Sequence, residues 1–256
     1  LPKEKLGKAE FSGQFMPLFD FKAKDHVELG QKLDIIDLEQ SAKVSGSRFA
    51  YLKNEAALLQ FALFELLKNK LLAEGFKPLV VPLLVRERAL YGTSHFPADR
   101  DQVYKIENRN IEDKNELYLV GSSEPPIFAC YMDKTLAENE LPQKVFAYSS
   151  CFRSEVGSWG KDVRGIKRVH QFDKLEMDAI TRSEESTAMM DYLLSLNEWF
   201  LKELKLPYHV ILMCSGDAGY AATHKKYDVE VWLPSQKTFM EVMSDTNATD
   251  FQARRL

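Results

Sequence analysis

The second half of the sequence places its apolar runs so close together that most of them have no room for a helix between them. Strands joined in this way pair antiparallel, because a parallel pair needs a crossover connection of a dozen or more residues. We therefore expect an α+β fold, in which an antiparallel β-sheet is flanked by helices. The expected strands are 117–120, 145–152, 169–180, 208–214, 227–233 and 238–244, with a further apolar run at 78–85 that Pro82 interrupts. The expected helices are 25–40, 54–74 and 184–204.

Length and composition limit the classes of protein to which the chain can belong. Its 256 residues, 45% of them hydrophobic, are enough for one sizeable core, and we expect a single domain over 1–256. The net charge of −4 gives no overall basic surface for nucleic acid. Three scattered cysteines form no disulfide or metal-binding pattern, and no apolar run is long enough to span a membrane. Without a signal peptide, a cytoplasmic protein is expected; because Leu1 replaces an initiator Met, we expect the true N-terminus to be missing.

The segment 147–180 reads as a strand, a glycine-containing polar loop and a returning strand. Arg153 follows the first strand, where its planar guanidinium can bind a phosphate and a carboxylate together. In the returning strand the period of two places His170, Phe172, Lys174 and Glu176 on one face. A solvated outer face would explain the charged residues but not Phe172 so well. A ligand site and an outer hairpin face both remain open from this pattern.

Two further segments carry polar residues in unusual places. After the strand 117–120, Gly121 leads into Ser122, Ser123 and Glu124, which form either an ordinary helix N-terminus or a pocket for a small polar substrate. Near the end of the chain, Glu241 and Ser244 offer oxygen ligands of the kind that Mg²⁺ prefers. Their positions have opposite strand parity, so both can reach one ion only if the strand ends or bulges between them.

Taken in order, these segments resemble the active site of class II aminoacyl-tRNA synthetases, and of the seryl enzymes in particular. CFRSE followed by RGIKRVHQFDKLE resembles motif 2 in its seryl form, and GFKPLVVPLLV resembles motif 1, the dimer-forming segment. YDVEVWLPSQKTFMEVMS and TDFQARR resemble the approach to motif 3, and FDFKAKDHVELGQKLDIIDLEQSAKVSGSRFAYLK resembles the entry to the seryl catalytic domain. The resemblance covers nearly the whole chain.

The resemblance implies that the protein is a serine–tRNA ligase, which joins L-serine to ATP as seryl-adenylate and then charges tRNA(Ser). It also implies tRNA(Sec) as a second substrate, and a homodimer formed through the Pro82 segment. ATP and Mg²⁺ are the implied cofactors, and no membrane is involved. Arg153 and Glu155 are the implied catalytic residues. The implied ATP-binding residues are Arg153, Ser154, Glu155, Val169, Phe172, Glu241, Val242, Met243 and Ser244, of which Glu241 and Ser244 hold Mg²⁺. The implied serine-binding residues are Ser122, Ser123, Glu124, Arg153 and Glu176.

The sequence departs from the family pattern at four points. Ser122 and Ser123 replace the usual Thr-Ala, and Met243 and Asp245 stand where small or cysteine residues are usual. The chain stops at Leu256 before motif 3, and the N-terminal tRNA-binding helical arm is absent. The expected catalytic domain is therefore incomplete at its C-terminus, and we expect the chain alone to be weakly active or inactive.

Two other functions stay open at this point. The first is a synthetase paralogue that activates a small amino acid for a carrier other than tRNA. The second is a non-catalytic synthetase-like protein that acts through its dimer surface. The presence of Arg153, Glu155, Phe172, Glu176 and Glu241 speaks against the second, because a decayed site would be expected to lose some of them.

Overall fold

The computed structural model describes residues 9–11, 17, 19–107, 116–157, 164–216, 218 and 223–256, and these residues form two compact units. The larger, which we call the hairpin unit, holds the described residues of 26–136, 143–179 and 255–256. The other, the meander unit, holds those of 1–25, 137–142 and 180–254. The expectation of one catalytic domain over 1–256 stays a prediction.

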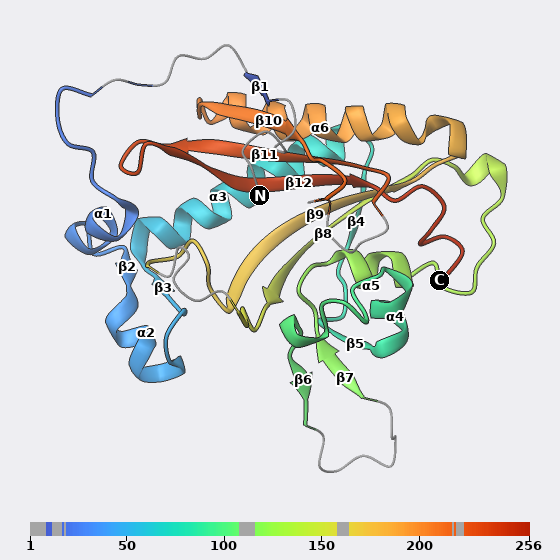
Figure 1. The fold of residues 1–256 in the computed structure, drawn as a ribbon, viewed down its shortest axis with the longest axis horizontal. Helices are drawn as coiled ribbons and strands as arrows, with labels where there is room; N and C mark the ends of the chain where they lie inside the picture. Colours follow the sequence, from blue (N-terminus) through green and yellow to red (C-terminus); the bar gives the residue numbers. More distant parts are fainter. Residues whose placement is uncertain are drawn as a thin grey trace. The chain divides into compact units, whose positions relative to one another are not determined.

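The hairpin unit combines short sheets with helices (Figure 1). Its strands are β2 (Ile36–Asp37), β3 (Tyr51–Leu52), β4 (Lys77–Leu79), β5 (Leu84–Arg86), β6 (Lys105–Ile106), β7 (Leu117–Leu119), β8 (Gln143–Phe152) and β9 (Gln171–Ile180), of which β9 ends in the meander unit. Its helices are α1 (His26–Lys32), α2 (Leu38–Ser45), α3 (Asn54–Ala73), α4 (Glu87–Gly92), the 3₁₀ helix η2 (Arg100–Gln102) and α5 (Glu124–Ala129). Strand order is β4-β8-β9 in one sheet and β5-β7-β6 in another, while β2 pairs with β3.

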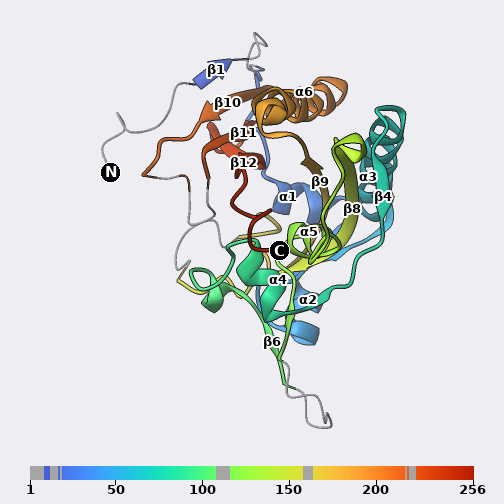
Figure 2. The same ribbon diagram turned by 90° about the vertical axis from the view of Figure 1, so that its right-hand side faces the viewer.

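The meander unit is a four-stranded antiparallel sheet with one long helix beside it. The strand order is β1 (Ala9–Phe11), β10 (Tyr208–Leu212), β11 (Lys225–Leu233) and β12 (Thr238–Asn247). The helix α6 (Ser186–Glu203) runs alongside β10–β12 in both Figure 1 and Figure 2. The Asn197 side chain of α6 donates hydrogen bonds of 3.0 and 2.8 Å to the two carboxylate oxygens of Asp245 in β12. The unit also holds the 3₁₀ helices η3 (Glu138–Glu140) and η4 (Ser183–Glu185).

The predicted α+β class is confirmed, and each of the six strands expected in the second half corresponds to one of β7–β12. The β4–β8 pair is parallel, however, with Pro78 opposite Phe146. The run 78–85 is not one interrupted strand, because β4 and β5 belong to different sheets. Pro82 lies between the two strands. Because proline has no backbone N–H to donate, this position outside both strands costs neither sheet a hydrogen bond.

The expected helix over 25–40 is wrong, because the chain forms α1, the short strand β2 and then α2. Asp34 has a left-handed backbone, with φ of 53°, which ends the first helix. Asp37 then accepts a hydrogen bond of 2.9 Å from the Gln40 backbone N–H and so caps the start of α2. Local bonds of this kind compete with a continuous helix.

Two groups of buried apolar residues hold the turn between β7 and α5. Tyr118 and Val120 belong to one group and Ile127 to the other, and all three are at most 2% exposed. Close packing of this kind leaves the intervening residues 121–124 little freedom to shift.

Among the described residues, no helix is both long and apolar enough to cross a membrane.

Candidate active site

Ser122 and Ser123 are both buried in the turn that follows β7, although both carry hydroxyl groups. The Ser123 hydroxyl lies 2.6 Å from that of Ser149 on β8, so it serves the internal packing of the turn. The Ser122 hydroxyl faces β9 instead, where it donates a hydrogen bond of 2.5 Å to the Glu176 carboxylate. Of the two serines, only Ser122 joins the predicted serine-binding side chains.

Lys174, Glu176 and Ser122 form a closed set of polar contacts. The Lys174 ammonium lies 2.5 Å from Oε2 of Glu176 and donates a 3.1 Å hydrogen bond to the Ser122 hydroxyl. Loss of hydration alone would lower the pKa of Lys174, but the charge of Glu176 and its hydrogen bond together raise that pKa above its ordinary value. The structure therefore already holds one ammonium group against Glu176.

Asp178 extends the same face of β9 and was missed by the sequence reasoning. Its Oδ2 is shut off from solvent and has no hydrogen-bond partner within the described part of the chain. Burial raises the pKa of Asp178 well above its usual value, and the negative charges of Glu176 and Glu124 act in the same direction. The period of two that placed Phe172, Lys174 and Glu176 on one face could have revealed Asp178 as well.

Arg153 follows the last residue of β8, and hydrogen bonds from both sides fix its backbone. Its N–H donates to the His170 carbonyl at 3.0 Å, and Nδ1 of His170 donates to the Arg153 carbonyl at 2.9 Å. The side chain donates from Nε to the Gly121 carbonyl at 3.2 Å and lies 5.2 Å from the centre of the Phe172 ring. No described residue occupies its two terminal nitrogens, so this fork can bind a phosphate or a carboxylate.

Two other predicted ATP residues lie directly after Arg153 and are held by the protein itself. The Ser154 hydroxyl donates to the Asp101 carbonyl. The Glu155 carboxylate accepts a 3.1 Å hydrogen bond from Arg168, and its backbone is left-handed with φ of 52°. The Glu155 carbonyl also accepts a 3.2 Å hydrogen bond from Arg48. Gly160, part of the predicted glycine-containing loop, lies outside the described residues.

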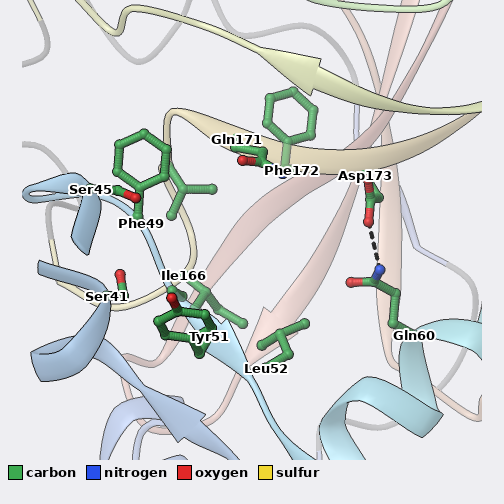
Figure 3. Close-up of a pocket in the computed structure, with 12 residues that line it drawn as sticks. Ser41, Ser45, Phe49, Tyr51, Leu52, Gln60, Ile166, Gln171, Phe172 and Asp173 are labelled. Atoms are coloured by element: carbon green, nitrogen blue, oxygen red, sulfur yellow. Dashed lines mark hydrogen bonds between the residues drawn. The ribbon is translucent and has the colours of Figure 1, made fainter.

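A cavity of about 460 Å³ lies at the start of β9 and includes the predicted ATP residues Val169 and Phe172. In Figure 3 the Phe172 ring lies on the far side of the β9 ribbon from Tyr51, Leu52 and Ile166. The sequence reasoning did not identify the other lining residues, which are Ser41, Ser45, Phe49, Ala50, Tyr51, Leu52, Gln60, Ile166, Gln171 and Asp173. They come from segments more than a hundred residues apart, which no local pattern could connect.

In the meander unit, a β-bulge resolves the parity conflict between Glu241 and Ser244. Glu230 pairs with Glu241, whereas Asp228 pairs with Ser244, so β12 carries one more residue than β11 over this stretch. Residues directly opposite each other share a face, and so do residues two apart on β11. Glu241 and Ser244 are therefore on the same face, and both are exposed.

Glu241 and Ser244 offer two oxygen ligands, which suits a hard cation that takes its other ligands from water and phosphate. A carboxylate and a hydroxyl are appropriate ligands for Mg²⁺, which usually keeps several waters and binds substrate phosphates. Within the described ranges, no cluster of three or more His, Cys, Asp or Glu side chains could hold a metal ion by itself. The roles of Glu241 and Ser244, and of the neighbouring Val242 and Met243 toward ATP, stay predictions.

Known proteins resemble this chain in both sequence and structure. Residues 104–256 match the family described as tRNA synthetase class II core domain (G, H, P, S and T). The serine–tRNA ligase of Acidothermus cellulolyticus is 45% identical over 240 residues, which cover 94% of this chain and 56% of that relative. The chain thus spans little more than half the length of that relative.

Two solved structures extend the similarity to three dimensions. Seryl-tRNA synthetase from Pyrococcus horikoshii, complexed with ATP, superposes with a TM-score of 0.87 at 40% identity, over 93% of this chain and 52% of that one. The cytoplasmic serine–tRNA ligase of Naegleria fowleri, in complex with AMP, superposes with a TM-score of 0.92 at 31% identity, over 99% of this chain and 60% of that one.

The raised pKa of Asp178 predicts the effect of replacing it. Because the pKa of Asp178 is higher in the folded chain than in the unfolded chain, ionising this carboxyl costs more free energy in the folded state. The free energy of unfolding therefore falls as pH rises above about 4. Asp178→Asn removes this penalty. We expect it to stabilise the chain by about 1–3 kcal/mol at pH 7.5 and to have little effect near pH 4, measured by urea denaturation.

Asp20→Asn, an exposed matched substitution, should leave the urea midpoint unchanged at both pH values. An Asp178→Asn protein that is less stable at pH 7.5, or equally shifted at both pH values, would show that folding does not raise the pKa of Asp178.

Proposed function

This chain belongs to the class II tRNA synthetase core domain family (G, H, P, S and T), and on that basis we propose that it activates L-serine with ATP and transfers the product to tRNA(Ser). The choice of serine rests on the contact between Ser122 and Glu176, which brings a hydroxyl and a carboxylate together on a partly buried face. A small substrate with an ammonium and a hydroxyl group matches this pair. The similarity to serine–tRNA ligases supports the same substrate.

In the first step, a carboxylate oxygen of serine attacks the α-phosphorus of ATP. A new oxygen–phosphorus bond forms, the bond to the β-phosphate bridge breaks, and pyrophosphate leaves. Arg153 would bind both the serine carboxylate and the α-phosphate through its two terminal nitrogens. The fork brings nucleophile and electrophile together and stabilises the negative charge of the transition state.

The amino-acid side of the site would use the polar set on β9 and the turn after β7. The serine ammonium would replace or share the position that Lys174 takes beside Glu176, with Ser122 as a hydroxyl partner. Because the ammonium and Lys174 carry the same charge, the ligand can take this place without leaving the Glu176 carboxylate unpaired. Ser123 and Glu124 complete the proposed serine-binding turn.

The nucleotide side would use Phe172 for stacking and Glu155 for the adenine amino group, with Ser154 and Val169 beside them. Arg168, which now pairs with Glu155, would have to release part of that carboxylate. Glu241 and Ser244 would hold Mg²⁺, which neutralises phosphate charge when it is bound. Val242 and Met243 are proposed as further ATP contacts.

In the second step a ribose hydroxyl of tRNA attacks the seryl carbonyl, and AMP leaves.

We further propose a homodimer, tRNA(Sec) as a second substrate, and the cytoplasm as the location. The dimer is supported by apolar side chains that α3 and the Pro82 segment expose to solvent. The exposed fractions of Leu58, Leu59 and Phe61 on α3 are 66, 58 and 61%, and Val80 before Pro82 is 103% exposed. A run of this kind is typical of an interface.

Binding of a stable analogue of seryl-adenylate, seryl-sulfamoyl-adenosine, tests the proposed site by calorimetry. Glu176→Gln should weaken binding roughly 10- to 100-fold, because it removes a charged hydrogen-bond acceptor from the ligand ammonium. Glu184→Gln, the same substitution at an exposed position, should have no effect. The alanyl analogue should also bind at least tenfold more weakly, because it leaves a buried hydroxyl site unpaired. Equal affinity for the two analogues would rule out recognition of serine by this pair.

The dimer is tested separately by light scattering, which measures molar mass in solution. Phe61→Glu places a charge in the exposed apolar run of α3 and should reduce the mass from that of a dimer to that of a monomer. Phe21→Glu, at a phenylalanine of similar exposure outside α3, should leave the dimer intact. A monomeric parent protein, or a dimer that tolerates Phe61→Glu, would exclude this surface as the interface.

A further inference from the structure

His95 is a partly exposed side chain that lies beside the proposed serine-binding turn and has no role in the reaction so far. Its Nε2 is 4.0 Å from Oε2 of Glu124, and the two side chains are 22 and 27% exposed. A small ligand can therefore reach both groups. The sequence reasoning missed His95, because it belongs to a different segment of the chain from Glu124.

The chain on either side of His95 is fixed by its neighbours. Ser94, which follows α4, has a left-handed backbone with φ of 70°. Phe96 is 1% exposed, and the centre of its ring lies 5.1 Å from that of the Tyr118 ring. His95 is held between these two residues, so its side chain has little freedom to move away from the turn.

The Thr93 hydroxyl determines which nitrogen of His95 can accept a hydrogen bond. Thr93 is fully buried, and its hydroxyl donates its one proton to the Ala89 carbonyl at 3.0 Å. The same oxygen lies 3.0 Å from Nδ1 of His95, so it accepts a hydrogen bond from the Nδ1–H group. A neutral imidazole has one donor and one acceptor nitrogen. Nε2 of neutral His95 therefore carries a lone pair on the side of Glu124.

Two hydrogen-bond acceptors that face each other favour a donor group between them. Within the described part of the chain, no group donates a hydrogen bond to Nε2 of His95. A nitrogen atom about 2.9 Å from both Nε2 and Oε2 of Glu124 would see them about 90° apart, since they are separated by 4.0 Å. The tetrahedral N–H groups of an ammonium can make both bonds with little bending. The gap therefore suits an ammonium and disfavours an anion.

The gap between His95 and Glu124 belongs to the same site as the Lys174–Glu176 pair. Loss of hydration lowers the pKa of Lys174, whereas the charges of Glu176 and Glu124 both raise it. Glu124 thus acts on the ammonium beside Glu176, which marks the position proposed for the substrate ammonium. An ammonium has three N–H groups, so a bond to Glu176 leaves two for other acceptors.

We propose that His95 is a further serine-binding residue, whose Nε2 accepts one N–H of the substrate ammonium while Glu124 accepts another. The inference rests on the proposed function, because it adds a contact to the serine side of that reaction. His95 recognises the amino group of the substrate and not its hydroxyl group.

Two adenylate analogues, compared by calorimetry on the same chain, separate a direct contact from a structural role. 3-Hydroxypropionyl-sulfamoyl-adenosine is seryl-sulfamoyl-adenosine without the ammonium. His95→Asn keeps a donor for Thr93 but has no acceptor at the position of Nε2. It should weaken the seryl analogue roughly 10- to 100-fold, because a hydrogen bond from a charged group is lost. It should leave the affinity for the hydroxypropionyl analogue unchanged.

Matched variants complete the test. His95→Gln has an amide oxygen that can accept at the position of Nε2, so its affinity for the seryl analogue should stay within about threefold of the parent chain. His224→Asn, the same substitution at an exposed histidine of the meander unit, should change neither affinity. Equal loss of both analogues in His95→Asn, no loss of either, or a loss in His95→Gln as large as in His95→Asn would overturn the role of His95. A parent chain that binds neither analogue would instead overturn the proposed function, and this inference with it.

Discussion

The pairing of Lys174 with Glu176 allows the hairpin unit to keep a group of acids on one partly buried face. Glu124, Glu176 and Asp178 act on one another electrostatically, and Lys174 supplies a positive charge among them. Besides burial, the charges of Glu176 and Glu124 raise the pKa of Asp178, and the positive charge of Lys174 opposes this effect. In the proposed reaction a substrate ammonium would bring to this face the same charge that Lys174 already provides.

The backbone around this face is fixed by contacts between the two strands of the hairpin. Arg153 and His170 exchange hydrogen bonds at the point where β8 ends and β9 is about to begin, and the Arg153 side chain reaches back to Gly121. The Arg153 side chain and the turn that carries Ser122 are thus held together. Positioning of this kind is the main contribution that a protein makes to a reaction without a covalent intermediate.

Much of this arrangement could be predicted from the sequence, because the period of two of a strand is a strictly local rule. It placed Phe172 and Glu176 on one face. It also indicated that the strand must either end or bulge between Glu241 and Ser244, and the pairing of β11 with β12 contains a bulge. The order of motifs supplied the family. Asp178 was within reach of the same rule, because it lies two residues after Glu176 on the same strand.

Other features depend on contacts between distant segments, which no single stretch of sequence encodes. The pairing of Arg168 with Glu155 and the cavity that joins Ser41 to Asp173 are of this kind. The break between α1 and α2 depends on the left-handed Asp34 and on the cap at Asp37, which outweigh the helical periodicity of 25–40.

Amino-acid-dependent exchange of pyrophosphate into ATP, measured on the natural protein, tests the central claim most directly. Serine should support exchange at least a hundredfold better than alanine or glycine, because neither of these has a hydroxyl group to bind beside the Ser122–Glu176 pair. Exchange that is absent with serine, or that is as fast with alanine, would contradict a serine-activating site.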